Sequence, residues 1–503
     1  MRIMRRVFQV VSLLLFFLLF LFATYPLKLK LPVDFFLRMD PLLGFSSAIA
    51  VRSFTLKFLP SAILLVFTIF LGRFFCGWIC PLGTTIDGFD KITGAKNRNR
   101  FRFRWWKFGL LVVVLVSALF SVQLAGFVDP ISLFTRTTVT VLYPIFVLFS
   151  DGLMGFLMSF GFIGETVFRF NEALRGFILP LNTMAFRGSI LIAIVFLIIL
   201  TSGLVHRRFW CRNLCPLGAL LGIFSTFRWY RRRVSEDCTD CGICFKNCRM
   251  DAINPDFRTT NNIECISCMD CQEICPVDAI DFGFMKKPAA TKIDFSRRRF
   301  LAAGATGLLS VGVLGIGFSN PIDRGCVVRP PGAVEEPEFL DRCVRCGECI
   351  RVCSTAGAGL QHAGLESGWG GIWTPVLLSE TGYCEYNCNL CGPVCPTGAI
   401  RPLSLEQKQE VKIGTAHFDK TRCIPWYYGE DCMVCEEHCP LPDKAIKFRE
   451  KQVVTIDGRE ANVLLPYVDE TLCIGCGICV TRCPVEGDRG IFLTNADEER
   501  WIG

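Results

Sequence analysis

Histidine is scarce in this chain, which has four in 503 residues: His206, His362, His417 and His438. Only His206 lies near an apolar run long enough to enter a membrane, so the count excludes a haem held in the bilayer by two histidines. No glycine-rich fingerprint follows a predicted strand, and the sequence gives no sign of a nicotinamide or flavin fold. Haem and nicotinamide are therefore not among the cofactors that we expect.

Most of the basic excess, a formal net charge of +8, comes from arginines that flank apolar runs. The positive-inside rule predicts this placement at a membrane, so we expect no nucleic-acid partner. With 51% hydrophobic residues the chain is too apolar for a purely soluble protein, and at 503 residues it is too long for one domain. We expect several domains, some of them in lipid.

Four apolar runs are predicted to span a membrane. The first, residues 7–23, follows three arginines and lacks a small-residue cleavage site, so we interpret it as a retained helix with its amino terminus inside. The others cover about residues 58–71, 108–125 and 190–204. A further apolar stretch, residues 139–160, is interrupted by proline, aspartate and glycine and is predicted to be interfacial or re-entrant.

Two strings of the form Cys-x3-Cys-Pro-Leu-Gly lie 135 residues apart, each after an apolar run and an arginine. They contain Cys76 with Cys80 and Cys211 with Cys215. Such an internal repeat predicts a pseudo-symmetric pair of hairpins with four thiols near the cytoplasmic membrane surface. We expect these thiols to be catalytic. The alternative is that they are buried structural cysteines at helix ends.

Two cysteine runs follow the bacterial ferredoxin spacing, in which three close thiolates bind one iron–sulfur cube and the fourth thiolate reaches the neighbouring cube. We assign one [4Fe-4S] cluster to Cys238, Cys241, Cys244 and Cys275, and a second to Cys265, Cys268, Cys271 and Cys248. A zinc site would need two separated pairs, whereas three cysteines fall within seven residues here, twice. The residues that follow, 251–253 and 278–280, are predicted to form the turn and short strand of a small α+β domain.

Three adjacent arginines open the stretch from Ser296 to Phe318, which continues without a charge. This pattern is typical of a twin-arginine export signal, here placed inside a chain. The alternative is an ordinary transmembrane helix with a basic inner flank. Both interpretations put the following residues outside.

Four more cysteine quartets follow this stretch. They are Cys343, Cys346, Cys349 and Cys353; Cys384, Cys388, Cys391 and Cys395; Cys423, Cys432, Cys435 and Cys439; and Cys473, Cys476, Cys479 and Cys483. The outer two are regular and the inner two are altered, so we expect a nested pairing, first with fourth and second with third, with adjacent pairing as the alternative. The alternative to iron–sulfur clusters in an oxidising compartment is a disulfide scaffold, but cluster spacing repeated four times argues against it. Cys326 belongs to no quartet.

These patterns predict an α-helical membrane domain plus α+β ferredoxin-like iron–sulfur domains, with six [4Fe-4S] clusters in all. We divide the chain into a four-span membrane domain at 1–231, a cytoplasmic two-cluster domain at 232–285, a linker with a fifth transmembrane helix at 286–322, and an exported four-cluster domain at 323–503. The expected location is a bacterial inner membrane.

Residues 1 to about 285 resemble the NapH type of membrane ferredoxin, which has four spans, two Cys-x3-Cys-Pro motifs and a cytoplasmic two-cluster domain. Residues 296–503 resemble the exported NapG type in their arginines, four quartets and the strings 395–400 and 443–446. The chain is similar to a fusion of the two. The resemblance implies a quinol dehydrogenase component that takes electrons from the quinone pool and passes them to a periplasmic nitrate reductase or multihaem cytochrome.

The membrane half also resembles the copper-reducing CcoG type and the NosR type. For these, the four hairpin thiols would handle metal or serve assembly.

The two ferredoxin domains are expected on opposite faces of the membrane, with a hydrocarbon core of about 30 Å between them. Either quinol docks near the outer face, or the four hairpin thiols hold a centre that shortens the gap.

Overall fold

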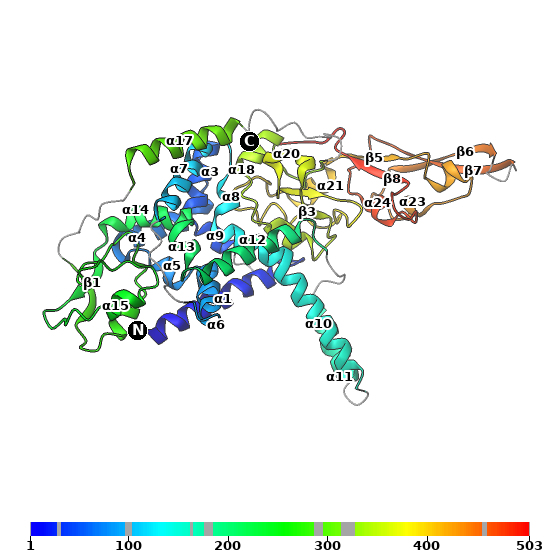
Figure 1. The fold of residues 1–503 in the computed structure, drawn as a ribbon. Coiled ribbons are helices and arrows are strands. Elements are labelled where there is room, and N and C mark those ends of the chain that lie inside the picture. The colour runs from blue at the N-terminus through cyan, green and yellow to red at the C-terminus, as the bar shows by residue number, and fades with distance from the viewer. Residues whose placement is uncertain are drawn as a thin grey trace.

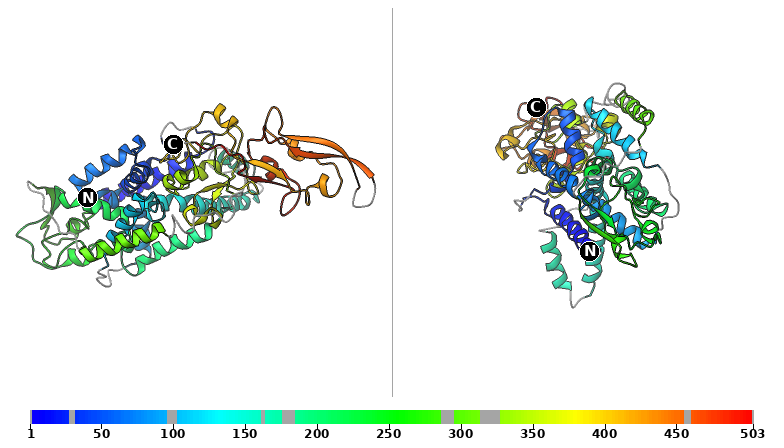
Figure 2. Two further views of the ribbon diagram at one scale, coloured as in Figure 1. Left: turned by 90° about the horizontal axis from the view of Figure 1, so that it is seen from above. Right: turned by 90° about the vertical axis from the view of Figure 1, so that its left-hand side faces the viewer.

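The computed structural model describes residues 2–27, 32–95, 103–160, 164–175, 185–285, 295–312, 327–454 and 460–501. The molecule is elongated, with a helical bundle in the middle, a small sheet at one end and a long hairpin of two strands at the other (Figures 1 and 2). It is mainly helical, and each sheet in the described residues has two antiparallel strands.

The bundle is built from the apolar first half of the chain. Its helices are α1 (Arg2–Phe22), α2 (Phe35–Arg38), α3 (Pro41–Val51), η1 (Leu56–Phe58), α4 (Leu59–Leu71), α5 (Phe74–Trp78), α6 (Pro81–Ile92), α7 (Trp105–Leu119), α8 (Ala125–Val128), α9 (Pro130–Thr137), α12 (Ser189–Thr201), η3 (Ser202–Leu204), α13 (Phe209–Asn213), α14 (Pro216–Phe224) and η4 (Ser225–Phe227). Two helices start in the same way: the carboxylates of Asp40 and Asp129 accept backbone N–H bonds at the starts of α3 and α9, each with proline as the first helical residue.

The segment expected to be interfacial or re-entrant, residues 139–160, is part of a long helical stretch. A π-helical turn, η2 (Thr138–Leu142), joins α9 to α10 (Tyr143–Met158), and α10 with α11 (Gly164–Arg175) projects away from the bundle (Figure 1). Within the described residues, Arg2–Phe22 and Pro130–Met158 are the two helical stretches long and apolar enough to cross a membrane. The other three expected spans correspond to shorter apolar helices, Leu56–Leu71, Trp105–Leu119 and Ser189–Leu204.

The first ferredoxin module pairs β1 (Tyr230–Val234) with β2 (Ile280–Phe284) and carries two short helices, α15 (Ile243–Asn247) and α16 (Asp270–Glu273). Asp251 and Asp278 have positive φ angles, as the tight turn after each cysteine run requires. Ile280 then begins β2, and Ile253 forms an isolated bridge. The structure thus agrees with the expected turn and short strand after each run.

Helix α17 (Arg297–Val311) lies along α7 on the outside of the bundle (Figure 1). The two helices approach closely at Gly307, where a Cβ would lie 2.9 Å from Val116, and Ser117 and Ser310 share a hydrogen bond of 2.8 Å beside it. Ser296 caps the helix ahead of the three arginines. The rest of the predicted signal stretch, from residue 313 on, lies outside the described residues, as does Cys326.

The described part of the last module contains three antiparallel strand pairs and several one-turn to two-turn helices. Its elements are α18 (Glu336–Arg342), α19 (Glu348–Cys353), β3 (Leu360–His362), η7 (Leu365–Ser367), α20 (Gly368–Gly371), β4 (Pro375–Leu377), α21 (Leu405–Glu410), β5 (Thr415–Phe418), α22 (Ile424–Tyr427), α23 (Val434–Glu437), β6 (Ile446–Val454), β7 (Glu460–Val468), α24 (Ile478–Arg482) and β8 (Ile491–Thr494). Strand β8 pairs with β5, and Trp501 bridges to Val334. The end of the chain therefore returns to the start of this module.

Candidate metal centres

In the first ferredoxin module, Cys248 joins the three close cysteines of the second run, as expected. Burial raises the pKa of Cys268 to about 12, and the neighbouring thiol of Cys248 contributes to that rise. Burial likewise raises the pKa of Cys271 well above its ordinary value, with Cys268, Cys265 and Cys248 close by. The backbone N–H of Ala252 donates to Cys248 Sγ at 3.2 Å, a contact that favours a thiolate there.

The other expected group in this module is formed by Cys238, Cys241 and Cys244. Cys244 is buried and interacts electrostatically with the other two thiols. Its Sγ lies 3.5 Å from Arg232 Nη2, so a cation faces this group. Cys275 packs in the same small hydrophobic core as Cys244, as do Cys248 and Cys271 of the other group, so its assignment stays a prediction.

The last module exchanges its fourth cysteines between adjacent quartets. Cys343, Cys346 and Cys349 line one small cavity together with Cys395, whereas Cys384, Cys388 and Cys391 line another with Cys353. A third cavity is lined by Cys439, Cys473, Cys476 and Cys479. The remaining thiols, Cys423, Cys432, Cys435 and Cys483, interact electrostatically with one another.

The expected nested pairing is therefore wrong, and the adjacent alternative is correct. Matching regular quartets with regular ones, and altered with altered, ignored chain connectivity. The fourth cysteine of a run leaves its own helix end and meets the loop of the next run with little chain between them, so adjacent exchange closes the shorter loops. Eight residues separate Cys423 from Cys432 in the altered third quartet, and the short helix α22 lies within them.

The two pairs of the last module meet at Cys384 and Cys476. The N–H of Cys384 donates to the carbonyl of Cys476 at 2.9 Å, and the two thiols belong to different groups. Burial raises the pKa of Cys476 to about 12, with Cys384 among the contributing neighbours. The four groups consequently lie in a row, from the quartet with Cys343 to the quartet with Cys423.

The four hairpin thiols also converge. Burial raises the pKa of Cys80 well above its ordinary value, and Cys76 and Cys211 add to that rise. Cys215 is affected in the same way by the other three thiols. Cys80 and Cys215 each begin a helix, α6 and α14, and their sulfurs accept the N–H bonds of Gly83 and Gly218 at 3.4 and 3.3 Å. The repeat thus forms one pseudo-symmetric group of four thiols.

Two buried arginines cross between the hairpins. Arg208, three residues before Cys211, donates from Nη1 to the carbonyl of Cys76 at 2.9 Å and from Nη2 to that of Gly83 at 3.3 Å. Arg73, three residues before Cys76, reaches the other hairpin at Gly218, where a Cβ would lie 2.6 Å from its Nη2. The sequence shows an arginine before each motif, but which hairpin each one contacts is decided by the tertiary structure.

The first ferredoxin module packs directly on the hairpins. A Cβ at Gly77, between Cys76 and Cys80, would lie 2.6 Å from the carbonyl of Ile266, between Cys265 and Cys268. Glu264, fully buried beside Cys265, pairs with Lys107 at 2.5 Å and with Arg73 at 3.4 Å. The second ferredoxin group and the hairpin thiols are therefore neighbours.

On the far side of the bundle, the last module is attached through arginines that sequence reasoning did not single out. Arg345, beside Cys346, donates to the carbonyl of Gln123 at 2.6 Å and stacks on Phe127. Arg136 of α9 donates to the carbonyl of Arg345 at 3.1 Å. Lys57 donates to the carbonyl of Cys395 at 2.8 Å. One continuous hydrophobic core includes Cys80, Cys211, Cys215 and Cys346, and links the hairpins to the last module.

The convergent thiols fit iron–sulfur clusters in ligand type and number. Each of the 28 cysteines among the described residues is free of disulfide bonds. Within the same residues, no three or more His, Cys, Asp or Glu side chains close around a point as the ligands of one metal ion do. A [4Fe-4S] cube, with iron at separate corners, needs its thiolates further apart than a single ion does.

Comparisons with known proteins agree with this chemistry. A "4Fe-4S binding domain" family matches residues 58–100 and 188–235, which contain both hairpins, and a "4Fe-4S dicluster domain" family matches residues 430–486. The ferredoxin-type protein NapG of Escherichia coli is 35% identical over 198 residues, which is 38% of this chain and 82% of the relative. The methylamine utilization ferredoxin-type protein MauM of Methylophilus methylotrophus is 30% identical over 188 residues, 37% of this chain and 79% of the relative.

A third relative, the putative electron transport protein YccM of Escherichia coli, is 29% identical over 260 residues, 51% of this chain and 61% of the relative. No solved structure matches significantly. The fold and the thiol groups define an iron–sulfur electron-transport protein of the ferredoxin type. Within that class, the chain belongs to the family of NapG and MauM ferredoxin-type proteins, to which about 38% of its length corresponds.

Proposed function

We propose that this chain oxidises quinol at the membrane and passes the electrons to a periplasmic acceptor, such as a nitrate reductase or a multihaem cytochrome. The resemblance of residues 1–285 to the NapH type supports a quinol substrate. Oxidation of one quinol to the quinone releases two electrons and two protons. An acceptor that takes one electron at a time must therefore accept them in two steps. Bound [4Fe-4S] clusters supply this one-electron chemistry.

The observation that carries this proposal is the order of the thiol groups along the molecule. The hairpin thiols contact the first ferredoxin module through Gly77 and share a hydrophobic core with Cys346 of the last module. The four groups of the last module continue the series away from the bundle. A chain built only to store clusters would have no need to order them between a membrane domain and a remote end.

We further propose that the four hairpin thiols hold a redox centre, which brings the total from six to seven. Burial raises the pKa of Cys211 to about 11, so a free thiol would stay protonated, whereas a metal ligand is deprotonated on binding. Arg73 and Arg208 would offset the negative charge of the thiolates. A centre at this place would divide the distance between the first ferredoxin module and the last.

Membrane location is part of the same proposal, with the first ferredoxin module in the cytoplasm and the last module in the periplasm. The two apolar helical stretches and the basic flanks of the expected spans support it. Helix α17 would be the last crossing, because it lies along α7 and the last module follows it.

Electron delivery tests the proposal. Cys349→Ser should abolish transfer from quinol to a periplasmic acceptor, while Cys244→Ser, at the far end of the series, should reduce it less. Cys326→Ser, at the cysteine that belongs to no quartet, is the matched control. Intact delivery in the Cys349 variant would show that the last module is not the outlet, and equal total loss in the Cys244 variant would place the cytoplasmic groups on the obligatory route.

Iron analysis tests the hairpin centre separately. Six clusters require about 24 iron atoms per chain at four per cluster, and a seventh of the same kind requires about 28. Replacing Cys80 and Cys215 together by serine should then lower the count by about four. An unchanged count in that variant contradicts a seventh [4Fe-4S] centre.

A second candidate function rests on the same four thiols. Four converging sulfurs, three of them buried, would also suit a soft metal such as copper, and the membrane half resembles the CcoG and NosR types. A metal-reducing assembly factor would reduce a copper salt in the purified state and would lose that activity in the Cys80 and Cys215 variant. Quinol-dependent delivery to an acceptor, retained without copper, would favour electron transport.

A further inference from the structure

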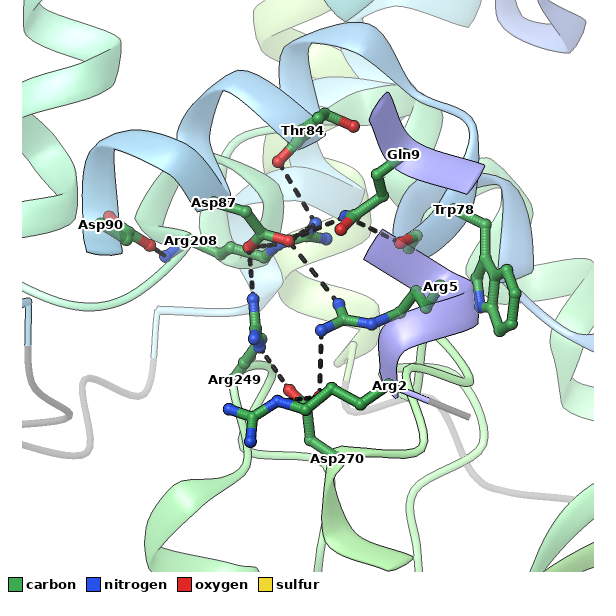
Figure 3. A network of polar contacts seen from close by, with 12 residues as sticks. Arg2, Arg5, Gln9, Trp78, Thr84, Asp87, Asp90, Arg208, Arg249 and Asp270 are labelled. Carbon is green, nitrogen blue, oxygen red and sulfur yellow. Dashed lines mark hydrogen bonds and ion pairs between the residues drawn. The ribbon is translucent and has the colours of Figure 1, made fainter. Parts of the chain in front are cut away.

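A cavity of about 420 Å³ opens beside the start of α1, next to α6 and the loop before α13. Six basic side chains and two carboxylates line it, with Gln9, Thr84 and Val10. The basic side chains are Arg2, Arg5, Arg6, Lys91, Arg207 and Arg249. Among the described residues, no cysteine lines this cavity, and its lining residue Asp87 pairs with the hairpin arginine Arg208 (Figure 3).

Two acids at this cavity, Asp87 and Asp270, are already paired with arginines. Asp87 pairs with Arg208 at 2.7 Å and with Arg249 at 3.1 Å, and Asp270 pairs with Arg249 and, at 3.0 Å, with Arg5 (Figure 3). Arg208 holds the pKa of Asp87 far below its ordinary value against the opposing effect of burial, so this carboxyl is ionised. These groups form a closed ion network that makes up one wall of the cavity.

The remaining cations exceed the remaining acid. Arg6 and Lys91 are exposed at the cavity, and within the described residues neither forms an ion pair. Arg207 donates from Nε to the carbonyl of Ala95 at 2.6 Å, which is a neutral acceptor. Among the described residues that line the cavity, Asp90 is the one acid outside the ion network. One of its oxygens has no hydrogen-bond partner in the described structure. The cavity therefore has a surplus of positive charge that an anion would neutralise.

An apolar surface continues from the cavity along α1. Val10 lines the cavity and is 53% exposed, and Ile3, Val7 and Val11 are 75%, 54% and 54% exposed on the same helix. Helix α1 is also one of the two stretches able to cross a membrane. A ligand with an anionic head and apolar chains would match both the cavity and the adjoining helix surface.

We propose that this cavity binds the phosphate headgroup of an anionic phospholipid, whose acyl chains lie along α1. The inference rests on the proposed membrane location, which puts the cavity at the cytoplasmic leaflet, where basic pockets recognise such headgroups. A quinol has no charge for the surplus cations to recognise, so it is not the ligand expected here. Because Arg5 and Arg249 also hold Asp270, which lies between Cys268 and Cys271, the lipid would brace the first ferredoxin module against the bundle.

Lipid binding by the full-length protein in neutral detergent tests this proposal. Native mass spectrometry gives an apparent Kd for added phosphatidylglycerol. The variant Arg6→Gln/Lys91→Gln removes two exposed cations of the cavity and leaves the ion network intact. We expect it to bind phosphatidylglycerol roughly 25-fold more weakly, the combined effect of two basic contacts. Arg52→Gln/Lys451→Gln, two exposed basic residues remote from the cavity, is the matched control and should bind as the parent does.

Three outcomes would overturn the assignment: equal binding by the cavity variant and the parent, equal binding of phosphatidylcholine and phosphatidylglycerol, or displacement of phosphatidylglycerol by inorganic phosphate at the same concentration. The last outcome would identify the ligand as a free anion without acyl chains. The readout involves no electron transfer, so it can fail while quinol oxidation stands and can succeed if quinol oxidation fails.

Discussion

Arg73 and Arg208 are fully buried, and each comes from one hairpin and reaches the other. A buried guanidinium is costly unless its donors are satisfied, and Arg208 meets that condition with a two-point pair to Asp87 and two backbone carbonyls. The planar fork of arginine makes this possible, whereas a lysine ammonium is a single point charge. At the residue scale, the crossed arginines fasten the two halves of the repeat around the four thiols.

Arg208→Lys should therefore lower the free energy of unfolding of the hairpin region by about 3 kcal/mol, because Asp87 keeps a buried charge with fewer partners. Thermal unfolding of the purified protein gives this difference. Arg207→Lys is the matched control. Arg207 is the neighbour of Arg208 in the chain, and its side chain makes one hydrogen bond, to the carbonyl of Ala95. A similar loss of stability in both variants would contradict the special role of Arg208.

His362 gives the last module a pH dependence. Burial lowers its pKa to about 4, and Nδ1 lies 3.0 Å from the Trp373 carbonyl, to which it donates as a neutral ring. In the unfolded chain the imidazole gains a proton near pH 6.5, but in the folded module only near pH 4. The unfolded state thus binds more protons between these values, and stability falls by about 3 kcal/mol as the pH falls through them.

His362→Gln should remove most of that slope, because glutamine stays neutral over the whole range. Hydrogen exchange of backbone amides in the last module, compared between variant and parent at pH 7 and at pH 5, measures the effect. Comparison at equal pH cancels the intrinsic pH dependence of exchange. Parallel loss of protection in both proteins on acidification would show that another group is responsible.

Short helices decide which quartets are partners. Helix α19 ends at Cys353, and this end meets the loop with Cys384, Cys388 and Cys391, not the three cysteines that precede it in the chain. The N–H of Leu360 donates to Cys353 Sγ at 3.4 Å, which holds the sulfur toward that loop. At the element scale, each helix delivers the fourth ligand of one cluster while its own loop holds the other.

The Cys353→Ser variant tests this exchange. It should perturb the same cluster as Cys391→Ser, and the two variants should give matching changes in the electron paramagnetic resonance spectrum of the reduced protein. Cys346→Ser should change a different signal. A spectrum that matches that of Cys479→Ser would instead support a nested pairing.

The arginines at the start of helix α17 allow a test of how the last module is exported. Ser296 caps the helix and Arg299 stacks over Trp105, so the arginines lie at its start, beside the start of α7. If the twin-arginine system reads this segment, Arg297→Lys/Arg298→Lys should leave the last module inside, since charge is kept and only the motif is lost. Protease accessibility in spheroplasts measures its location. Normal export of the variant would indicate an ordinary transmembrane helix.

At the scale of the whole molecule, the bundle lies between the two ferredoxin modules (Figure 1). Buried arginines join the last module to the bundle in both directions: Arg345 of the module donates to the Gln123 carbonyl, and Arg136 of the bundle donates to the Arg345 carbonyl and stacks on Trp373. These contacts fix the last module to the bundle at Arg345, the first arginine between its cluster cysteines.

Labelling of the apo-protein in intact cells by a membrane-impermeant maleimide tests the proposed orientation. Cysteines after residue 318, such as Cys432, should react, whereas Cys241, although exposed on the first ferredoxin module, should not. Permeabilised cells provide the control, in which Cys241 becomes reactive. Labelling of Cys241 or Cys80 without permeabilisation would refute the orientation.

The sequence by itself determined the ligand type, the number of quartets and the repeated hairpins, because iron–sulfur spacing is local and a cluster tolerates few separations between its cysteines. It also identified the turns at Asp251 and Asp278. It could not determine which quartets exchange ligands, and the expectation based on matching spacing was wrong. The proline and glycines of 139–160 also do not interrupt the chain as a helix, since Pro144 follows the π-helical turn η2 and lies in the first turn of α10, where proline is tolerated.

Only the tertiary structure decided the rest. The convergence of Cys76, Cys80, Cys211 and Cys215, the crossing of Arg73 and Arg208, and the cavity beside α1 depend on residues more than a hundred positions apart. No local pattern encodes such contacts, because they arise when apolar helices pack and their buried polar groups find partners wherever the chain brings them.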